Sequence, residues 1–460
     1  MQGSHAWTAD GAVFDETNLI SAAGLIPVME LAEQAGLSDL LDEHVHFGCE
    51  RVKAGAANPT PKLTSIIAGM AAGADSIDDL DVVRAGGMKQ VFTGVYAAAT
   101  LGILLREFTF GHASQLAAVL RRHVLALAER TAVLDGITTQ AFVDIDSLLR
   151  PVYGHAKQGA SFGHTKIAGK TVLRRGLSPL ATTISTPAAA PVVAGIRLRA
   201  GRAGSAKGAA SMVTDAVATA RAAGATRIMV RGDSAYGNGP VVTAARKAGA
   251  MFSVVLAKNT AVTAAISAIG DEAWVGVRYP NAVQDPDTGD WISEAQVAET
   301  TYTAFAGTRH EVTARLIVRR VKDKNQPEGQ DPLFPVWRHH PFLTNNDEPV
   351  AAADITHRQH AIVETLFSDL IDGPLAHLPS GSFAANSAWT LLAAITHNLL
   401  RAAATLTDHL RVARGATLRR QLINVPARLA RPQRRPVLHL PAHWPRADAW
   451  KALWRNVFQT

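Results

Sequence analysis

The sequence contains very little cysteine and no long uninterrupted apolar segment. Its 460 residues include one cysteine, Cys49, so an intramolecular disulfide is impossible and a zinc site built from several cysteines is excluded. No apolar run of about 18 residues, the length that crosses a bilayer, occurs without a charge, and the beginning of the chain lacks the pattern of a signal peptide. We therefore expect a cytoplasmic protein that does not contact membranes.

Basic residues are missing from the first part of the chain and concentrated in the last. Residues 1–50 contain nine acids and no Lys or Arg, whereas residues 401–460 contain eleven Arg, one Lys and two Asp. Clustered Arg suits phosphate, because the planar guanidinium binds two oxygens at once. The basic segment 411–460 is therefore predicted to bind DNA, with Arg434 and Arg435 among its contacts. The alternative is a solvated Arg-rich tail.

The hydrophobic pattern divides the chain into helical and strand-rich parts. Apolar residues at spacings of three and four predict an all-helical N-terminal domain over residues 1–135. Strand patterns in "AFVDIDSLL", "LATTIS" and "PVVAGIRLR", a helix pattern in "SAKGAASMVTDAVATARAAG" and a further strand in "TRIMVRGD" predict a mixed α/β core over residues 136–272. Residues 273–350 are predicted to form a β-rich insertion, and helices resume over residues 351–410.

Two acids in the first core strand are candidates for metal binding. Asp144 and Asp146 in "VDID" point to the same face of a strand, because side chains alternate with a period of two. Adjacent carboxylates among apolar residues repel each other, and a divalent cation relieves that repulsion. The alternative is that both acids lie at a solvated strand end.

A third acid, Asp233, follows the apolar run Ile228–Val230 in "IMVRGDSAYG". In a sheet of three antiparallel strands and a crossover helix, Asp233 can lie beside the first strand and its acids. The small residues that follow it are expected to leave room for a sugar–phosphate chain. The alternative is that Asp233 only caps a turn, since Asp followed by Ser and Gly favours turns.

The segment "THRQHAIVETLFSDLIDG" supplies a fourth acid, Glu364, on a predicted helix. Glu364 lies among apolar positions, and the helix can carry it to the edge of the sheet. An ordinary surface Glu is the alternative. His357 and His360 are weak zinc candidates, because two imidazoles have no clear further partners. Carboxylate oxygens without cysteine favour Mg²⁺ or Mn²⁺, and two such ions about 4 Å apart promote phosphodiester attack by water or a 3′-hydroxyl.

Four segments occur in the order found in one family: "VDIDSLLRPVYGHAKQGASFGH", "RGDSAYG", "HAIVETLFSDLIDGPLAHLPSG" and "FAANSAWTLLAAITHNLLRA". The chain resembles the bacterial insertion-sequence transposases of the insertion sequence 1380 family, within the wider class that has a DDE catalytic triad. This resemblance implies an RNase H-like catalytic core interrupted by a β-rich insertion. It also implies a triad of Asp146, Asp233 and Glu364, with Asp144 as the fallback for the first acid and as a further metal ligand.

The resemblance further implies two bound Mg²⁺ or Mn²⁺ ions, double-stranded DNA with terminal inverted repeats, target DNA, a homodimer on DNA and a nucleoid-associated location. Relatives commonly have Thr where this chain has Leu148, and basic residues where it has His360 and Ile371. Arg358 is expected to replace one of the missing charges, and Lys157 and His360 are also expected to contact DNA. A nuclease without strand transfer, and a repressor or inert relic that only binds DNA, remain the alternative functions.

Overall fold

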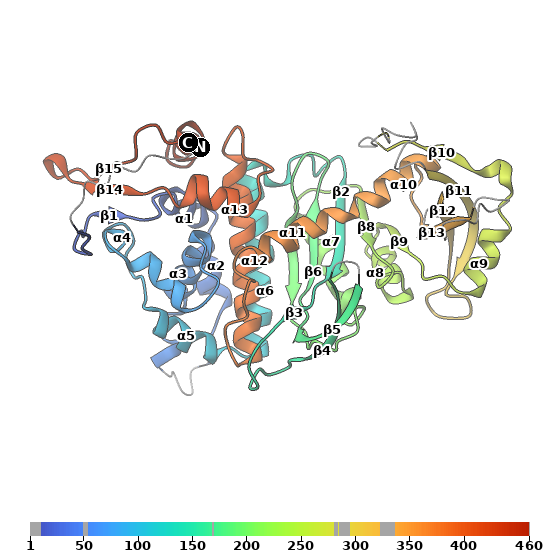
Figure 1. Cartoon of the computed structure of the whole chain (residues 1–460), viewed down its shortest axis with the longest axis horizontal. Helices are drawn as coiled ribbons and strands as arrows, with labels where there is room; N and C mark the ends of the chain where they lie inside the picture. The colour runs from blue at the N-terminus through green and yellow to red at the C-terminus, as the bar shows by residue number, and fades with distance from the viewer. Residues whose placement is uncertain are drawn as a thin grey trace.

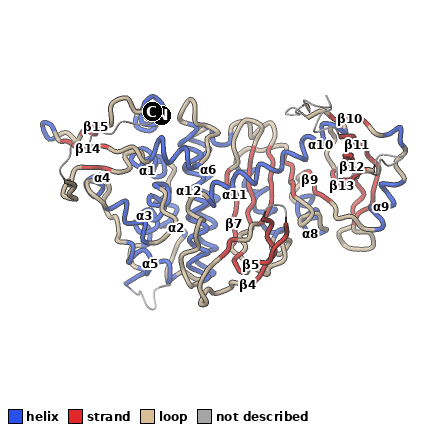
Figure 2. Tube along the Cα trace, viewed as in Figure 1, coloured by secondary structure: helices blue, strands red, loops and turns tan. Residues whose placement is uncertain are grey.

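The computed structural model describes residues 11–48, 54–167, 170–279, 284, 295–322 and 336–459. Helices dominate one end of the molecule and strands the other, as Figure 2 shows. No helix in the described part of the chain combines the length and apolar character that crossing a bilayer requires. The fold is therefore a mixed α/β arrangement built around one large sheet (Figure 1).

The first part of the chain is largely helical, but residues Leu19–Ile20 form a short strand, so it is not all-helical as predicted. Its helices are α1 (Leu25–Gln34), α2 (Leu37–His44), α3 (Pro59–Ala72), α4 (Met88–Val91), α5 (Ala98–Glu107) and α6 (Phe110–Arg130). Helix α6 begins with a capping box, in which the Thr109 hydroxyl accepts from the His112 backbone and the His112 ring accepts from the Thr109 backbone. Its buried residues, such as Leu116, Leu120 and Leu127, recur at helical spacing and form the inward face.

The large sheet has nine strands in the order β10-β11-β12-β13-β9-β8-β2-β6-β7. The central strands are β2 (Ala141–Ser147), β6 (Leu180–Ser185), β7 (Val192–Arg197), β8 (Ile228–Gly232) and β9 (Met251–Val255). Strands β2, β6 and β7 are antiparallel neighbours, whereas β8 is parallel to both β2 and β9. Helices α7 (Ala209–Ala222) and α8 (Gly239–Lys247) make the crossovers into β8 and β9.

The predicted β-rich insertion extends the central sheet. Its strands are β10 (Val275–Val277), β11 (Ala295–Ala304), β12 (Val312–Lys322) and β13 (Trp337–Thr344), and α9 (Thr260–Ser267) precedes them. Strand β13 pairs with β9, so the insertion strands continue the ladder of the core. A separate small sheet of β3 (Arg150–Pro151), β4 (Ser161–Ile167) and β5 (Lys170–Leu177) follows β2 in the chain.

Helix α12 (Phe383–Thr405) lies between the N-terminal helices and the sheet (Figure 1). It is apolar and buried on nearly all sides, which is typical of a helix packed between two layers. Strand β7 is the edge of the sheet, and the Asn398 side chain on α12 covers it. The Asn398 amide accepts from the Val193 backbone N–H at 2.7 Å and donates to the Val193 carbonyl at 2.9 Å, which satisfies backbone groups that a neighbouring strand would otherwise pair.

The C-terminal segment packs on the N-terminal helices. Strand β14 (Ala427–Ala430) pairs with β1 (Leu19–Ile20) on one side and with β15 (Val437–His439) on the other. The terminal helix α14 (Ala447–Phe458) lies against α1, where the Gln34 side chain donates to the Val457 carbonyl at 3.0 Å. Residues that the hydrophobic pattern assigned to two separate units thus share one sheet and one set of contacts. Helix α13 (Gly415–Leu418) and a π-turn precede β14.

Candidate active site

Two of the predicted acids come directly after the last paired residues of neighbouring parallel strands. The register of β2 and β8 pairs Asp144 with Arg231 and Ile145 with Gly232. The next residues along the two strands are Asp146 and Asp233. Because neighbouring strands lie about 4.8 Å apart, the two acids lie at the same edge of the sheet. This position at the carboxyl ends of parallel strands is a common location for chemistry in α/β folds.

Asp144 is engaged by Arg231 inside the sheet. Its two carboxylate oxygens accept from Nε and Nη2 of Arg231 at 2.7 and 2.8 Å, and both side chains are 1% exposed. The Arg231 guanidinium also lies over the Phe142 ring at 4.0 Å and donates to the Thr356 carbonyl at 2.8 Å. This bidentate pair satisfies the Asp144 charge internally, so of the two acids in "DID" the partly exposed Asp146 is better placed to bind a metal ion.

The turn after β8 positions Asp233 at the surface. Asp233 is exposed, its side chain accepts from the Ala235 backbone N–H at 2.9 Å, and its carbonyl accepts from Tyr236 and Gly237. The carboxylate therefore also organises the turn, as the alternative interpretation proposed. Gly237 has a packing role, because a Cβ on it would lie 1.9 Å from the Val255 carbonyl oxygen of β9, and the expected room for a sugar–phosphate chain stays a prediction. Gly237 is small because a neighbouring strand passes close to it.

Tyr236 is a buried phenol that packs beside Gly232 at the end of β8. Burial raises the pKa of its hydroxyl, and the charges of Asp146 and Asp233 raise it further, while the nearby Ser147 hydroxyl and Arg199 lower it. No hydrogen bond of good geometry reaches this oxygen from the described residues. Both Asp146 and Asp233 thus act electrostatically on one group, in agreement with the shared edge that the strand register places them on.

Glu364 belongs to a helix that crosses the same face of the sheet. Helix α10 (Val350–Arg358) and helix α11 (Ile362–Ile371) are joined by a 3-10 turn, so the single predicted helix is interrupted at Gln359–Ala361. Arg231 binds the Thr356 carbonyl of α10 from the face that Asp144 occupies, and α11 contacts β2. Glu364 is in the first turn of α11 and is exposed, whereas Val363 and Phe367 are buried.

The orientation of α11 directs Glu364 toward the end of the sheet that carries the acids. Ile362, Thr365 and Asp369 line a pocket together with the turn at residues 186–191, which joins β6 to β7. Because β6 is antiparallel to β2, this turn lies at the beginning of β2. Glu364 is on the other flank of α11, since successive helical residues are rotated by about 100°. It therefore faces the side on which β2 ends.

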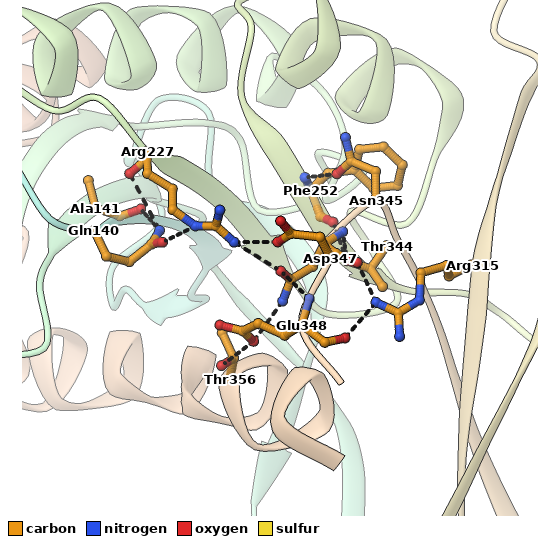
Figure 3. A network of polar contacts seen from close by, with 11 residues as sticks. Gln140, Ala141, Arg227, Phe252, Arg315, Thr344, Asn345, Asp347, Glu348 and Thr356 are labelled. Atoms are coloured by element: carbon orange, nitrogen blue, oxygen red, sulfur yellow. Dashed lines mark hydrogen bonds and ion pairs between the residues drawn. The ribbon is translucent and has the colours of Figure 1, made fainter. Parts of the chain in front are cut away.

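A polar network holds α10 in place, and Figure 3 shows its residues. Arg315 on β12 donates to the carbonyls of Asn346 and Glu348, the latter at 2.8 Å. The Glu348 carboxylate accepts from the Thr356 hydroxyl at 2.9 Å, and the neighbouring Asp347 accepts from Arg227 at 2.6 Å. The insertion, the central sheet and α10 are therefore tied together at the end of the sheet opposite the acids.

The described residues contain two candidate acids at one edge of the sheet but no complete metal cage. Among them, no group of three or more His, Cys, Asp or Glu side chains is close enough to hold a metal ion, so Glu364 does not enclose an ion together with Asp146 and Asp233. The two Asp carboxylates still fit Mg²⁺, which is typically held by one or two carboxylates, several waters and substrate phosphate oxygens. The donor set therefore suits an ion completed by water and by phosphate.

The two histidines considered for zinc have structural roles. The His357 ring stacks on Phe342 at 4.1 Å, and its Nδ1 hydrogen-bonds the Ser253 hydroxyl at 2.8 Å. Burial lowers the pKa of His357 to about 3, with smaller contributions from His360 and Arg231. His360 Nδ1 hydrogen-bonds the His357 carbonyl at 2.8 Å. With the absence of a metal-holding group among the described residues, nothing in this geometry supports zinc.

The sequence over residues 11–460 matches the family described as Transposase DDE domain group 1. The chain belongs to this family. A search of curated proteins finds no match. Among solved structures, the chain is similar to piggyBac transposase in a cryo-EM synaptic complex with hairpin DNA, with a TM-score of 0.42 and 11% identity, over 85% of this chain and 76% of that chain.

The predicted DNA contacts of this transposase-family chain lie in different surroundings. Arg434 and Arg435 are exposed between β14 and β15. Arg358 is exposed and lies over the Tyr279 ring at 4.1 Å. Lys157 is bound by backbone oxygens, with its ammonium donating to Leu378 at 2.7 Å and Ser380 at 3.0 Å. Lys157 therefore anchors its loop to the segment before α12, and its contact with DNA stays a prediction, like those of the arginines and of His360.

Two residues of the site were not predicted from the sequence. The sequence patterns assign no role to Arg231 or to Tyr236. The signal was nevertheless present, because "DID" and "RGD" both carry charged residues two positions apart. In adjacent parallel strands, such patterns place one charge of each strand side by side. Opposite charges at the inner positions indicate a buried pair, and the outer acids then remain at the sheet edge.

Proposed function

We propose that this transposase-family protein is an insertion-sequence transposase, which cuts the ends of its mobile element and joins the freed 3′-hydroxyls to target DNA. The observation that carries the proposal is the register of β2 and β8, in which Asp146 and Asp233 directly follow the paired residues Ile145 and Gly232. The order of antiparallel strands β7, β6 and β2 followed by parallel β8 and β9 supports an RNase H-like core.

In this proposal Asp146 and Asp233 are metal ligands, and Glu364 is the third acid of the triad. Two Mg²⁺ or Mn²⁺ ions, when bound, would activate the attacking water or 3′-hydroxyl and stabilise the leaving oxygen. The carboxylates themselves orient the phosphodiester and do not attack it. The position of Glu364 on the flank of α11 that faces the end of β2 supports its approach to the phosphate once DNA is present.

The DNA substrate is proposed to carry terminal inverted repeats, and two copies of the chain are proposed to handle the two ends together. The eleven arginines of residues 401–460 support contact with a polyanion. Arg434 and Arg435, which are exposed in the turn between β14 and β15, are proposed to bind the phosphates of this DNA.

The test uses a supercoiled plasmid carrying the two DNA segments that flank the coding sequence, with Mg²⁺ or Mn²⁺ present. Wild-type protein is expected to excise the segment between them and to yield joined products. Asp146→Asn, Asp233→Asn and Glu364→Gln are each expected to lower cleavage at least about a thousandfold while binding of the same DNA is retained. Asp271→Asn is the matched control, because the Asp271 side chain is 98% exposed and distant from the edge in sequence and sheet order.

Each other outcome points to a specific alternative. Cleavage without joined products indicates a nuclease that lacks strand transfer. DNA binding without cleavage in the wild type, unchanged by the three substitutions, indicates a repressor or an inert relic. Full cleavage by Asp233→Asn would show that the acids at the sheet edge are not the catalytic ones.

A further inference from the structure

A groove of about 900 Å³ separates the N-terminal helices from the segment that follows β2. One wall is formed by α5 and includes Ile103 and Arg106. The opposite wall carries Arg150 and Tyr153, and residues 376–379 before α12 close the groove. Arg150 lies four residues after Asp146 in the chain, so this wall continues directly from the strand that carries the first proposed catalytic acid.

The charges that line the groove are mainly positive. Arg106, Arg150 and Lys157 are cations, His377 contacts Asp75 at 3.1 Å, and Asp78 is the acid among the lining residues. Arg106 is exposed and forms no ion pair with the described residues. A strand of nucleic acid is attracted to such a surface, because each contact between a cation and a phosphate releases condensed counterions.

Arg150 is held rigidly and retains an unused donor. Its Nη2 donates to the Ala376 carbonyl at 2.6 Å, whereas its buried Nε has no hydrogen-bond partner among the described residues. Burial lowers the pKa of Arg150, so desolvation already disfavours its charge. A partly desolvated guanidinium is stabilised by a nearby negative charge, so a phosphate in the groove would favour the charged form of Arg150.

The groove also has apolar surface suited to a base. Tyr153 is 76% exposed and Ile103 is 42% exposed, although both are large hydrophobic side chains. The loop that carries Tyr153 is fixed by Arg175, which donates to the carbonyls of Gly154 at 2.6 Å and His155 at 3.2 Å. A fixed, exposed aromatic ring beside cations is the arrangement on which unpaired bases stack.

We propose that this groove holds a single strand of DNA, with phosphates on Arg106 and Arg150 and a base stacked on Tyr153, leading to the acids at the end of β2. The proposal rests on the transposase function proposed above and adds the path of the strand. A single strand is favoured over duplex because base pairing and stacking within duplex DNA hide the base faces that Tyr153 would contact.

The experiment measures binding of a fluorescent single-stranded oligonucleotide and of a blunt duplex of the same sequence over a range of salt. Tyr153→Ala is expected to weaken single-strand binding by about fivefold to a hundredfold, the range of one lost base stack, and to change duplex binding less than about twofold. Arg106→Gln is expected to weaken single-strand binding. It should also make the salt dependence shallower, with the negative slope of log affinity against log salt smaller in magnitude by about 0.7, as for one lost phosphate contact. Arg106→Lys should keep most of that slope.

Two matched controls lie outside the groove. Arg246→Gln removes an exposed cation at the end of α8, and Phe14→Ala removes a fully exposed aromatic ring. Both are expected to bind the single strand as the wild type does. Because Arg106 and Tyr153 are exposed, their variants should melt at the wild-type temperature, and this separates lost binding from lost folding.

The groove assignment is overturned if the Tyr153 and Arg106 variants bind the single strand like wild type, or if their losses are equal for single strand and duplex. The plasmid cleavage assay, run in parallel, separates this failure from failure of the proposed function. Intact wild-type cleavage with unchanged single-strand binding in the variants refutes the groove alone. Wild-type protein that neither binds nor cuts DNA refutes both.

Discussion

The substitution Asp144→Asn separates the two acids of "DID" by their physical roles. Asp144 accepts two hydrogen bonds from Arg231, at 2.7 and 2.8 Å, and both side chains are 1% exposed. Asparagine has nearly the same shape but no charge, so the substitution leaves the Arg231 guanidinium buried without a counter-charge. Asp146 is partly exposed at the end of the same strand, so Asp146→Asn changes a carboxylate that already contacts solvent.

The expected cost follows from this burial. Removing one partner of a buried ion pair typically lowers the free energy of unfolding by about 3–5 kcal/mol. The contacts of Arg231 with the Thr356 carbonyl and the Phe142 ring remain, which favours the lower part of that range. Asp146→Asn is expected to cost less than about 1 kcal/mol, as is usual for a substitution away from the core.

The assay is urea denaturation, together with hydrogen exchange of the β2 and β8 amides, for Asp144→Asn, Asp146→Asn and the double variant Asp144→Leu with Arg231→Met. The double variant should recover most of the stability, because an apolar pair of similar volume needs no charge compensation. DNA cleavage is measured in parallel and should be lost in Asp146→Asn. The reasoning is refuted if Asp144→Asn is as stable as wild type and inactive, since Asp144 would then be the functional acid.

Two further results are expected. His357 has its pKa lowered to about 3 in the folded protein against about 6.5 when unfolded, so its contribution to stability is present above pH 6.5 and is lost as the pH falls toward 3. As the pH is lowered through that window, the free energy of unfolding of the wild type should fall by about 1.4 kcal/mol per pH unit more than that of His357→Gln. Equal slopes of the two proteins in a pH series would contradict the lowered pKa of His357. Arg315→Gln removes the donor to the Asn346 and Glu348 carbonyls and should lower the free energy of unfolding by about 1–3 kcal/mol. The α10 amides should exchange faster in Arg315→Gln than in the control variant Arg309→Gln. Unchanged exchange in α10 would show that the network in Figure 3 does not hold this helix.

Much of the candidate site could be predicted from local pattern. Alternation in "VDID" places Asp144 and Asp146 on one face, and an apolar run ending at Asp233 indicates a strand that stops at an acid. The pairing of Asp144 with Arg231 could not be predicted with the same ease, because it depends on the register of two strands 87 residues apart. Register is set by the packing of whole strands and by the connecting helix, so single-strand patterns do not contain it.

The exposed position of Glu364 was also beyond the sequence pattern. Apolar residues around it predict a helix, but they do not indicate the 3-10 turn at Gln359–Ala361 that separates α10 from α11. The Arg315 network and the Arg231 contact with Thr356 determine where α10 lies, and these contacts come from distant parts of the chain. The predicted insertion was recognised as strand-rich, yet its pairing with β9 depends on tertiary contacts of β13.

The sequence by itself determined the helical first part, the central strands and the chemical character of the acids, because periodicity and side-chain type are local properties. Tertiary structure alone decided which acid is neutralised by Arg231, which face α11 crosses, and that β1 and β14 join the two ends of the described chain in one sheet. These features depend on register and on packing between distant segments, for which many arrangements satisfy the same local pattern.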